Sequence, residues 1–143
     1  MNQKQKLSLF LLRISLGLLF FYAGITKVLN PNWSAAGYLN SAKTFSGFYH
    51  WLASSSLLPF VNFINEWGLL LLGVSLILGL FVRWSSIGGI LLMILYYLPI
   101  LRFPYPDANS YIVDQHIIFI FVLVVFIAFN AGKAWGLDSK RIS

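Results

Sequence analysis

The sequence of 143 residues contains no cysteine and few charged residues, and each shortage excludes a class of protein. A chain without cysteine forms no disulfide, holds no cysteine-ligated iron–sulfur cluster and has no attachment site for c-type haem. Charged residues make up 10% of the sequence, against about 25% in soluble domains, while 59% of the residues are hydrophobic. We therefore expect one integral membrane domain over residues 1–143.

Histidines and acidic residues are scarce too, with two histidines and four acids in the chain. His50 and His116 do not make a typical haem pair, and one histidine with scattered carboxylates is a poor zinc or di-iron set. No Walker loop, dinucleotide-binding glycine pattern or Ser/His/Asp spacing occurs. We expect no haem, iron–sulfur cluster or metal in this chain, so any redox chemistry must come from a bound molecule or a partner chain.

Four apolar runs are long enough to cross a bilayer, which takes about 20 apolar residues. The predicted spans are Leu7–Leu29, Phe60–Val82, Ser85–Leu101 and Ile112–Ala131. The predicted fold class is an all-α integral membrane protein with a four-helix bundle. Ten lysines and arginines stand singly beside these runs, which is typical of membrane topology and not of nucleic-acid binding. If both termini lie on one side of the membrane, seven of these ten basic residues lie on that side too. Because basic residues favour the cytoplasmic side, we expect cytoplasmic termini in a cell inner membrane.

The connection at residues 30–59 is rich in aromatic residues. Ser34 can cap a helix, and apolar residues recur at helical spacing up to Leu52. Trp33 and Tyr38 belong to a group of rings that suits the membrane interface. We expect an interfacial or shallow re-entrant helix from about Ser34 to Leu52, packed over the outer mouth of the bundle. The alternative is an aromatic belt without a ligand role.

Polar residues inside the apolar runs are the candidate functional residues, because ionisable groups at membrane depth are expensive to bury. One stripe of the first span carries two cations and two glycines: Arg13, Gly17, Phe20, Gly24 and Lys27. Glu66, the single glutamate, lies in the outer half of the second span, near the level of Lys27, and the two are predicted to pair. Arg102, Asp114 and His116 are expected at the same membrane depth as Lys27 and Glu66. Arg13 and Arg83 lie at the inner end without an acid, because Asp138 follows the fourth span.

Each of these residues also has a structural interpretation. Lys27 can snorkel to the headgroups, and Arg83 and Arg102 can be turn or topology residues. Asp114 can cap the fourth helix. His116 can be a packed polar contact, and Glu66 a structural partner of Lys27.

An ordered set of residues resembles the DoxX family over nearly the whole chain. The set comprises Arg13-Ile14-Ser15-Leu16-Gly17, Ala23-Gly24-Ile25-Thr26-Lys27, Gly37-Tyr38-Leu39, Glu66, Gly73, Arg83, Val113-Asp114-Gln115-His116 and the run from Ala131 to Asp138. The resemblance implies a four-helix membrane protein. The segment with Trp33 and Tyr38 is similar to the DoxD-type membrane subunit of thiosulfate:quinone oxidoreductase, which implies a quinone ligand and a partner subunit.

The leading hypothesis is a quinone-interacting membrane subunit of a redox complex. Lys27 or His116 would donate to a quinone oxygen, and Glu66 would exchange the proton. The other candidate ligand-binding residues are Arg13, Tyr22, Trp33, Tyr38, Trp67, Arg83, Arg102 and Asp114. Two alternatives stay open: a non-catalytic scaffold that docks other proteins, and a small-molecule permease that works as a homo-oligomer.

Overall fold

The computed structural model describes residues 1–141, and the regular secondary structure of this part of the chain is helical. Its elements are α1 (Gln3–Val28), α2 (Ala36–Asn40), α3 (Ser46–Leu52), α4 (Leu58–Leu78), α5 (Val82–Ile100), α6 (Gln115–Ala128) and the 3₁₀ helices η1 (Ala131–Lys133) and η2 (Leu137–Lys140). Residues 1–141 form no β-strand, only two isolated bridges in the loop between α5 and α6. The all-α prediction is confirmed.

Three helices, α1, α4 and α5, are long and apolar enough to cross a membrane. The predicted fourth span, Ile112–Ala131, is a shorter helix, because Asp114 caps α6 at one end and Asn130 adopts a left-handed conformation after the other. At 1.5 Å per residue, the 14 residues of α6 extend over about 21 Å, less than the ~30 Å hydrocarbon core. The structure thus supports three spans by length and composition.

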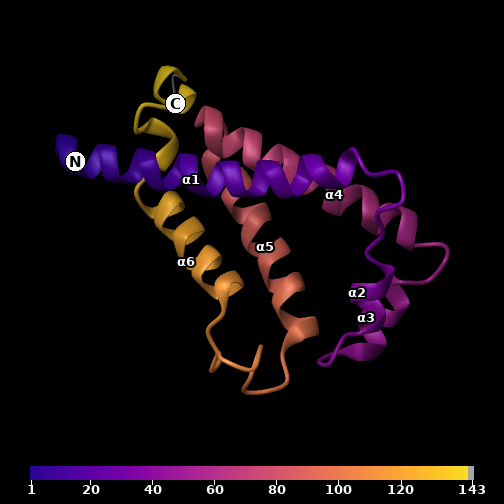
Figure 1. Ribbon diagram of the computed structural model, residues 1–143. Helices are drawn as coiled ribbons and strands as arrows, with labels where there is room; N and C mark the ends of the chain where they lie inside the picture. The colour runs from indigo at the N-terminus through magenta and orange to yellow at the C-terminus, as the bar shows by residue number, and fades with distance from the viewer. Residues whose placement is uncertain (142–143) are drawn as a thin grey trace.

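Helices α1 and α4 are antiparallel neighbours that touch backbone to backbone (Figure 1). A methyl group added at Gly24 would lie 2.3 Å from the backbone nitrogen of Leu70. One added at Gly73 would lie 2.3 Å from the nitrogen of Phe21. Small residues are what permits such close approach between membrane helices. The predicted glycine stripe therefore faces α4 and not lipid.

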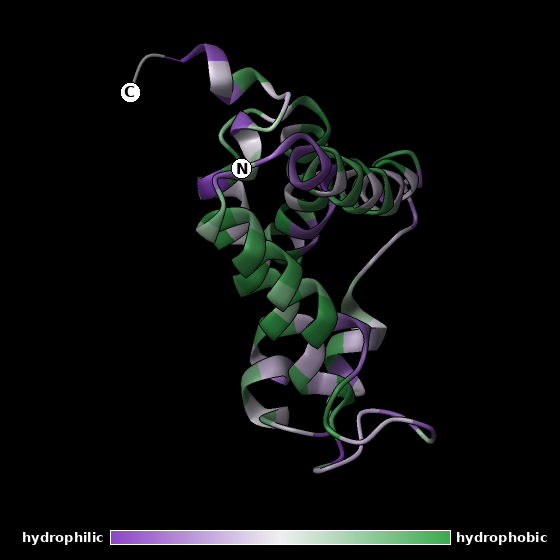
Figure 2. Ribbon diagram, turned by 90° about the vertical axis from the view of Figure 1, so that its left-hand side faces the viewer, coloured by the Kyte–Doolittle hydropathy of each residue, from purple (hydrophilic) through white to green (hydrophobic). Residues whose placement is uncertain are grey.

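Helices α5 and α6 form a second antiparallel pair, and the two pairs diverge from the end where both termini lie (Figure 1). Leu72, Leu76, Leu123 and Phe126 belong to the buried core between the pairs. Figure 2 shows that the long helices consist largely of hydrophobic residues. Large exposed apolar side chains, such as Leu71 of α4, are expected where a helix faces lipid.

The aromatic connection between α1 and α4 does not form the single predicted helix from Ser34 to Leu52. It forms two short helices, α2 and α3, because the chain turns at residues 41–45 and Phe45 takes a left-handed φ of 53°. A small second core holds Leu39 and Tyr49 against residues of α4 and α5. The segment therefore bridges the open end between the diverging pairs (Figure 1).

Candidate functional site

A cavity of about 310 Å³ lies where the α2–α3 segment covers the diverging ends of α4 and α5. Its wall is almost entirely apolar and aromatic: Ala35, Tyr38, Leu39, Phe48, Tyr49, Trp51, Leu52, Leu57, Phe60, Val61, Ile64, Asn65, Leu92, Leu95 and Tyr96. Its size is that of a small-ligand pocket, which usually combines apolar walls with a few placed polar groups.

The polar groups of the cavity are an asparagine and tyrosine hydroxyls. Tyr96 of α5 donates its hydroxyl proton to Oδ1 of Asn65 on α4, and Tyr38 donates to the backbone carbonyl of Tyr96. The side-chain nitrogen of Asn65 donates to the carbonyl of Val61 at 2.9 Å. Asn65 and Tyr96 therefore form one polar corner in an otherwise apolar chamber.

A proline explains how the α2–α3 segment is attached to α5. Pro99 lies inside α5 and has no backbone N–H, so the carbonyl of Leu95 loses its helical donor. The hydroxyl of Tyr49, which is 1% exposed, donates to that carbonyl at 2.9 Å. Four residues further along α5, the carbonyl of Pro99 accepts a hydrogen bond from the backbone nitrogen of Lys43 at 2.8 Å. The broken helix end thus supplies acceptors for the segment that closes the cavity.

Burial keeps the two tyrosines of the covering segment protonated. Desolvation raises the pKa of the Tyr38 hydroxyl to about 12, with smaller contributions from Tyr49 and Asp114. Desolvation likewise raises the pKa of Tyr49 to about 12. Both hydroxyls are therefore hydrogen-bond donors over the whole physiological pH range.

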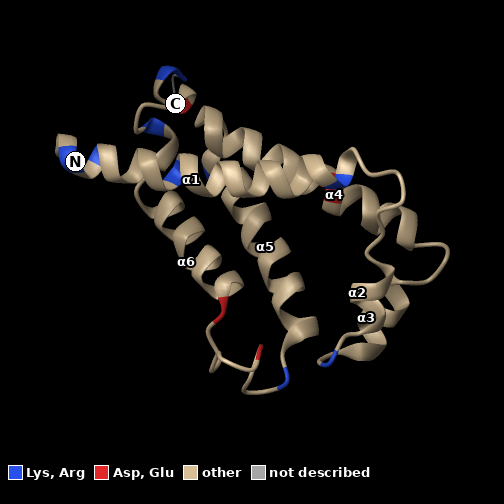
Figure 3. Cartoon of the chain, in the orientation of Figure 1, with Lys and Arg blue, Asp and Glu red and all other residues tan. Residues whose placement is uncertain are grey.

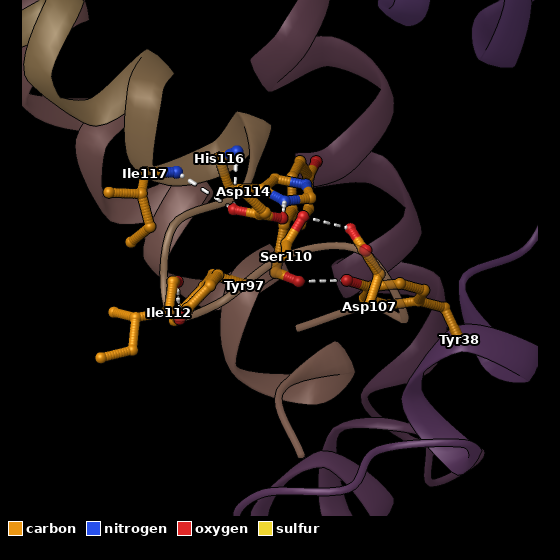
Figure 4. Close-up of polar contacts among 9 residues, drawn as sticks. Tyr38, Tyr97, Asp107, Ser110, Ile112, Asp114, His116 and Ile117 are labelled. Atoms are coloured by element: carbon orange, nitrogen blue, oxygen red, sulfur yellow. Dashed lines mark hydrogen bonds and ion pairs between the residues drawn. The ribbon is translucent and has the colours of Figure 1, made fainter. Parts of the chain in front are cut away.

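A carboxylate–histidine pair, Asp114 and His116, lies at the start of α6 (Figure 4). Asp114 caps α6 by accepting hydrogen bonds from the backbone nitrogens of His116 and Ile117. Its other oxygen lies 2.6 Å from Nδ1 of His116. The imidazole ring meets Tyr96 edge-on, with ring centroids 6.1 Å apart. Asp114 is therefore both a helix cap and the group that orients His116 beside the cavity wall.

The predicted Lys27–Glu66 ion pair is not formed. Among residues 1–141, the ion pairs with a nitrogen–oxygen distance of 4.0 Å or less do not include these two residues. The α1–α4 register does place the two residues at the same level, since Gly24 faces Leu70. Nζ of Lys27, however, donates to the carbonyl of Ala23 at 3.1 Å and lies 5.4 Å from the ring centre of Trp33. Glu66 is half-buried and does not line the cavity, whereas its neighbour Asn65 does.

Arg13 lies at the opposite end of the molecule and has a structural environment. Its side chain is fully buried, and its guanidinium donates to the carbonyl of Leu76 at 3.0 Å and to that of Ala134 at 3.1 Å. The prediction that this end lacks an acid is wrong, because Asp138 and Arg83 line one pocket here. The chain turns back after α6, and the carboxylate of Asp138 accepts hydrogen bonds from the nitrogens of Phe81 and Val82 at 2.9 and 3.0 Å.

The other predicted ligand-binding residues are dispersed. Trp33 packs at the edge of the small core under α2 and α3. Four others are exposed and lie outside the cavity wall: Tyr22, Trp67, Arg83 and Arg102. Asn65 and Tyr96 were not among the predicted site residues, and Tyr49 was predicted only as one of the aromatic rings of the connection. An asparagine within an apolar run and a proline near a helix end were the signals that pointed to them.

These features define a helical membrane protein with a largely apolar chamber near one end. The model of the DoxX family, a family of membrane proteins, matches residues 8–100, which is more than half of the chain. The chain belongs to the DoxX family, as the resemblance predicted. Comparison with curated proteins and with solved structures gave no match.

Proposed function

We propose that the protein is a quinone-interacting membrane subunit of a redox complex, and that the quinone ring binds in the chamber under α2 and α3. The observation that carries the proposal is the chamber itself, about 310 Å³ of apolar and aromatic wall with the Asn65–Tyr96 corner as its polar feature. A quinone needs a flat apolar slot and hydrogen-bond partners at its oxygens, and this chamber supplies both.

The hydroxyl of Tyr96 is the proposed donor to a quinone oxygen. A hydroxyl proton rotates to suit its acceptor, so Tyr96 can turn from Asn65 to the ligand. His116 is the proposed proton group, because Asp114 holds its imidazole ring beside Tyr96. Glu66 and Lys27 lie at the same level on the α1–α4 side, and we propose them as a second route for protons. We propose that electrons come from a partner subunit, as the resemblance of the Trp33 and Tyr38 segment to a DoxD-type subunit of thiosulfate:quinone oxidoreductase implies.

We further propose an inner-membrane location in which α6 and its flanking residues complete a fourth span. Basic residues gather at the end where the N- and C-termini lie, which supports a cytoplasmic position for that end (Figure 3). The chamber then opens towards the outer half of the bilayer. The contrasting scaffold role is supported by the buried Arg13 contacts, which fix the helices without any ligand.

The test is the quinone content and affinity of protein purified in a mild detergent. We expect co-purified quinone in the wild type and weaker quinone binding in Tyr96→Phe and in Asn65→Leu. Tyr22→Phe is the matched control, because Tyr22 is 70% exposed and lies outside the chamber. A wild type that binds no quinone would refute the proposal and favour the scaffold.

A further inference from the structure

A second apolar space runs along the outside of α4 and α5 and meets the chamber. It is a groove of about 600 Å³ that extends from the turn at Leu80 and Phe81 to Leu95. Three residues, Ile64, Leu92 and Leu95, line both the groove and the chamber. Two helices that diverge from a tight turn leave such a space between them (Figure 1).

We infer that the groove holds the hydrophobic tail of the ligand whose ring occupies the chamber. This inference rests on the proposed function and narrows its substrate class to quinones with a long apolar tail. It also makes the route of entry lateral, from the bilayer through the α4–α5 face. Because Ile64, Leu92 and Leu95 line both spaces, the groove and the chamber are adjacent, and the inferred ligand passes from one to the other at these residues.

The chemistry of the groove fits an alkyl or isoprenoid chain. Its wall is made almost wholly of aliphatic residues and glycines from α4 and α5. The two serines that line it, Ser75 and Ser85, donate to the carbonyls of Leu80 and Val82 and contact each other. Their hydrogen-bonding capacity is used within the protein, and they lie at the end farther from the chamber. The groove therefore offers apolar contact and no polar recognition to its occupant.

Two of the three glycines that line the groove, Gly68 and Gly88, are not needed for helix packing, whereas the third, Gly89, is closely packed. A methyl group added at Gly88 would meet no atom within 4 Å, and one added at Gly68 would meet only Leu92 at 3.5 Å, an ordinary contact. This differs from Gly24 and Gly73, where an added methyl would strike the neighbouring backbone. A side chain can therefore start at Gly68 or Gly88 without its Cβ striking a neighbouring helix, and both positions line the groove.

The experiment compares two quinones with one head group, one with a ten-carbon tail and one without. Their dissociation constants are measured for the full chain in detergent, for the wild type and for Gly68→Leu and Gly88→Leu. Gly47→Leu is the control, because a methyl group there also meets no atom within 4 Å and Gly47 lies outside both spaces. Variants are compared with the wild type for each quinone, so that partition of the tail into detergent cancels.

We expect both groove variants to weaken binding of the tailed quinone by about tenfold, as when one to two methylene groups lose their burial. Binding of the tail-less quinone should stay at the wild-type value, which also shows that the chamber has folded. Equal affinity of wild type and variants for the tailed quinone would overturn the inference, since a bilayer lipid would then be the occupant. A change in the oligomeric state of the groove variants would also overturn the inference, because a second copy of the chain would then be the occupant of the groove. In both cases tail-less binding would leave the proposed function standing.

Discussion

Arg13 in α1 donates through Nη2 to the backbone carbonyl of Ala134, 121 residues later in the chain, at 3.1 Å. Its Nη1 donates to the carbonyl of Leu76 in the last turn of α4, where an intrahelical donor is missing. One fully buried guanidinium thus joins α1, the end of α4 and the segment that follows α6. A flat, forked donor suits two separate carbonyls better than a single ammonium group does.

The first prediction concerns this guanidinium. Arg13→Lys should lower the free energy of unfolding by about 3 kcal/mol, because one ammonium cannot reach both carbonyls and a buried acceptor is left unpaired. Unfolding in mixed micelles measures the change. Arg83→Lys is the control, since Arg83 is exposed. A stability of Arg13→Lys equal to that of the wild type would show that the fork geometry does not matter.

The second prediction concerns the cap that Asp138 provides for α5. Asp138→Ala should lower stability by about 1–2 kcal/mol, the usual cost of losing a capping side chain. Gly132→Ala should act in the same way, because its added methyl group would lie 2.2 Å from a carboxylate oxygen of Asp138. The double variant should then cost little more than the larger single loss, since both changes break one contact. If the two losses of stability add up in the double variant, the two residues act independently and the prediction is wrong.

The third prediction separates packing glycines from groove glycines. Gly24→Ala and Gly73→Ala should each destabilise the protein by about 1–3 kcal/mol, because a methyl group meets backbone atoms of the facing helix. Gly88→Ala should be neutral or stabilising by up to about 1 kcal/mol, since alanine is the better helix former and has free space there. Thermal unfolding in one detergent compares all three. Loss of stability in Gly88→Ala would contradict this division.

The fourth prediction concerns Tyr49 and pH. Tyr49→Phe should cost about 1–3 kcal/mol, because it leaves the carbonyl of Leu95 buried without a donor. Below pH 10 both folded and unfolded states keep the phenol protonated, so the difference from the wild type is constant. Between pH 10 and about 12 only the unfolded state loses the proton, so the wild-type advantage shrinks as the pH rises. A pH titration of unfolding for both proteins measures this window.

The local features of this fold could be predicted from the sequence. The glycine stripe of α1 follows from the helical repeat, and small residues in a membrane helix mark a close contact. Asp114 ahead of an apolar run is a capping signal, and it caps α6. In both cases residues within a few turns of one another carry the information.

Features that depend on tertiary contacts could not be predicted in the same way. The common level of Lys27 and Glu66 was predictable, but the lysine side chain is flexible enough to take its own helix carbonyl and the Trp33 ring instead. The helical spacing between Ser34 and Leu52 gave no sign of the break at Phe45. Asp138 reaches α5 because η1 and η2 turn the chain back, and no periodic pattern encodes that turn.

The cap at Val82 also has a consequence for the order of events during synthesis. Asp138 follows Val82 by 56 residues, so the ribosome completes α5, the loop and α6 before the capping carboxylate exists. Until then the amide groups at the start of α5 depend on water or lipid headgroups as partners. The carbonyl of Ala134 likewise reaches Arg13 only after α1, α4, α5 and α6 have been made. Residues that follow α6 therefore lock together helices that were made earlier.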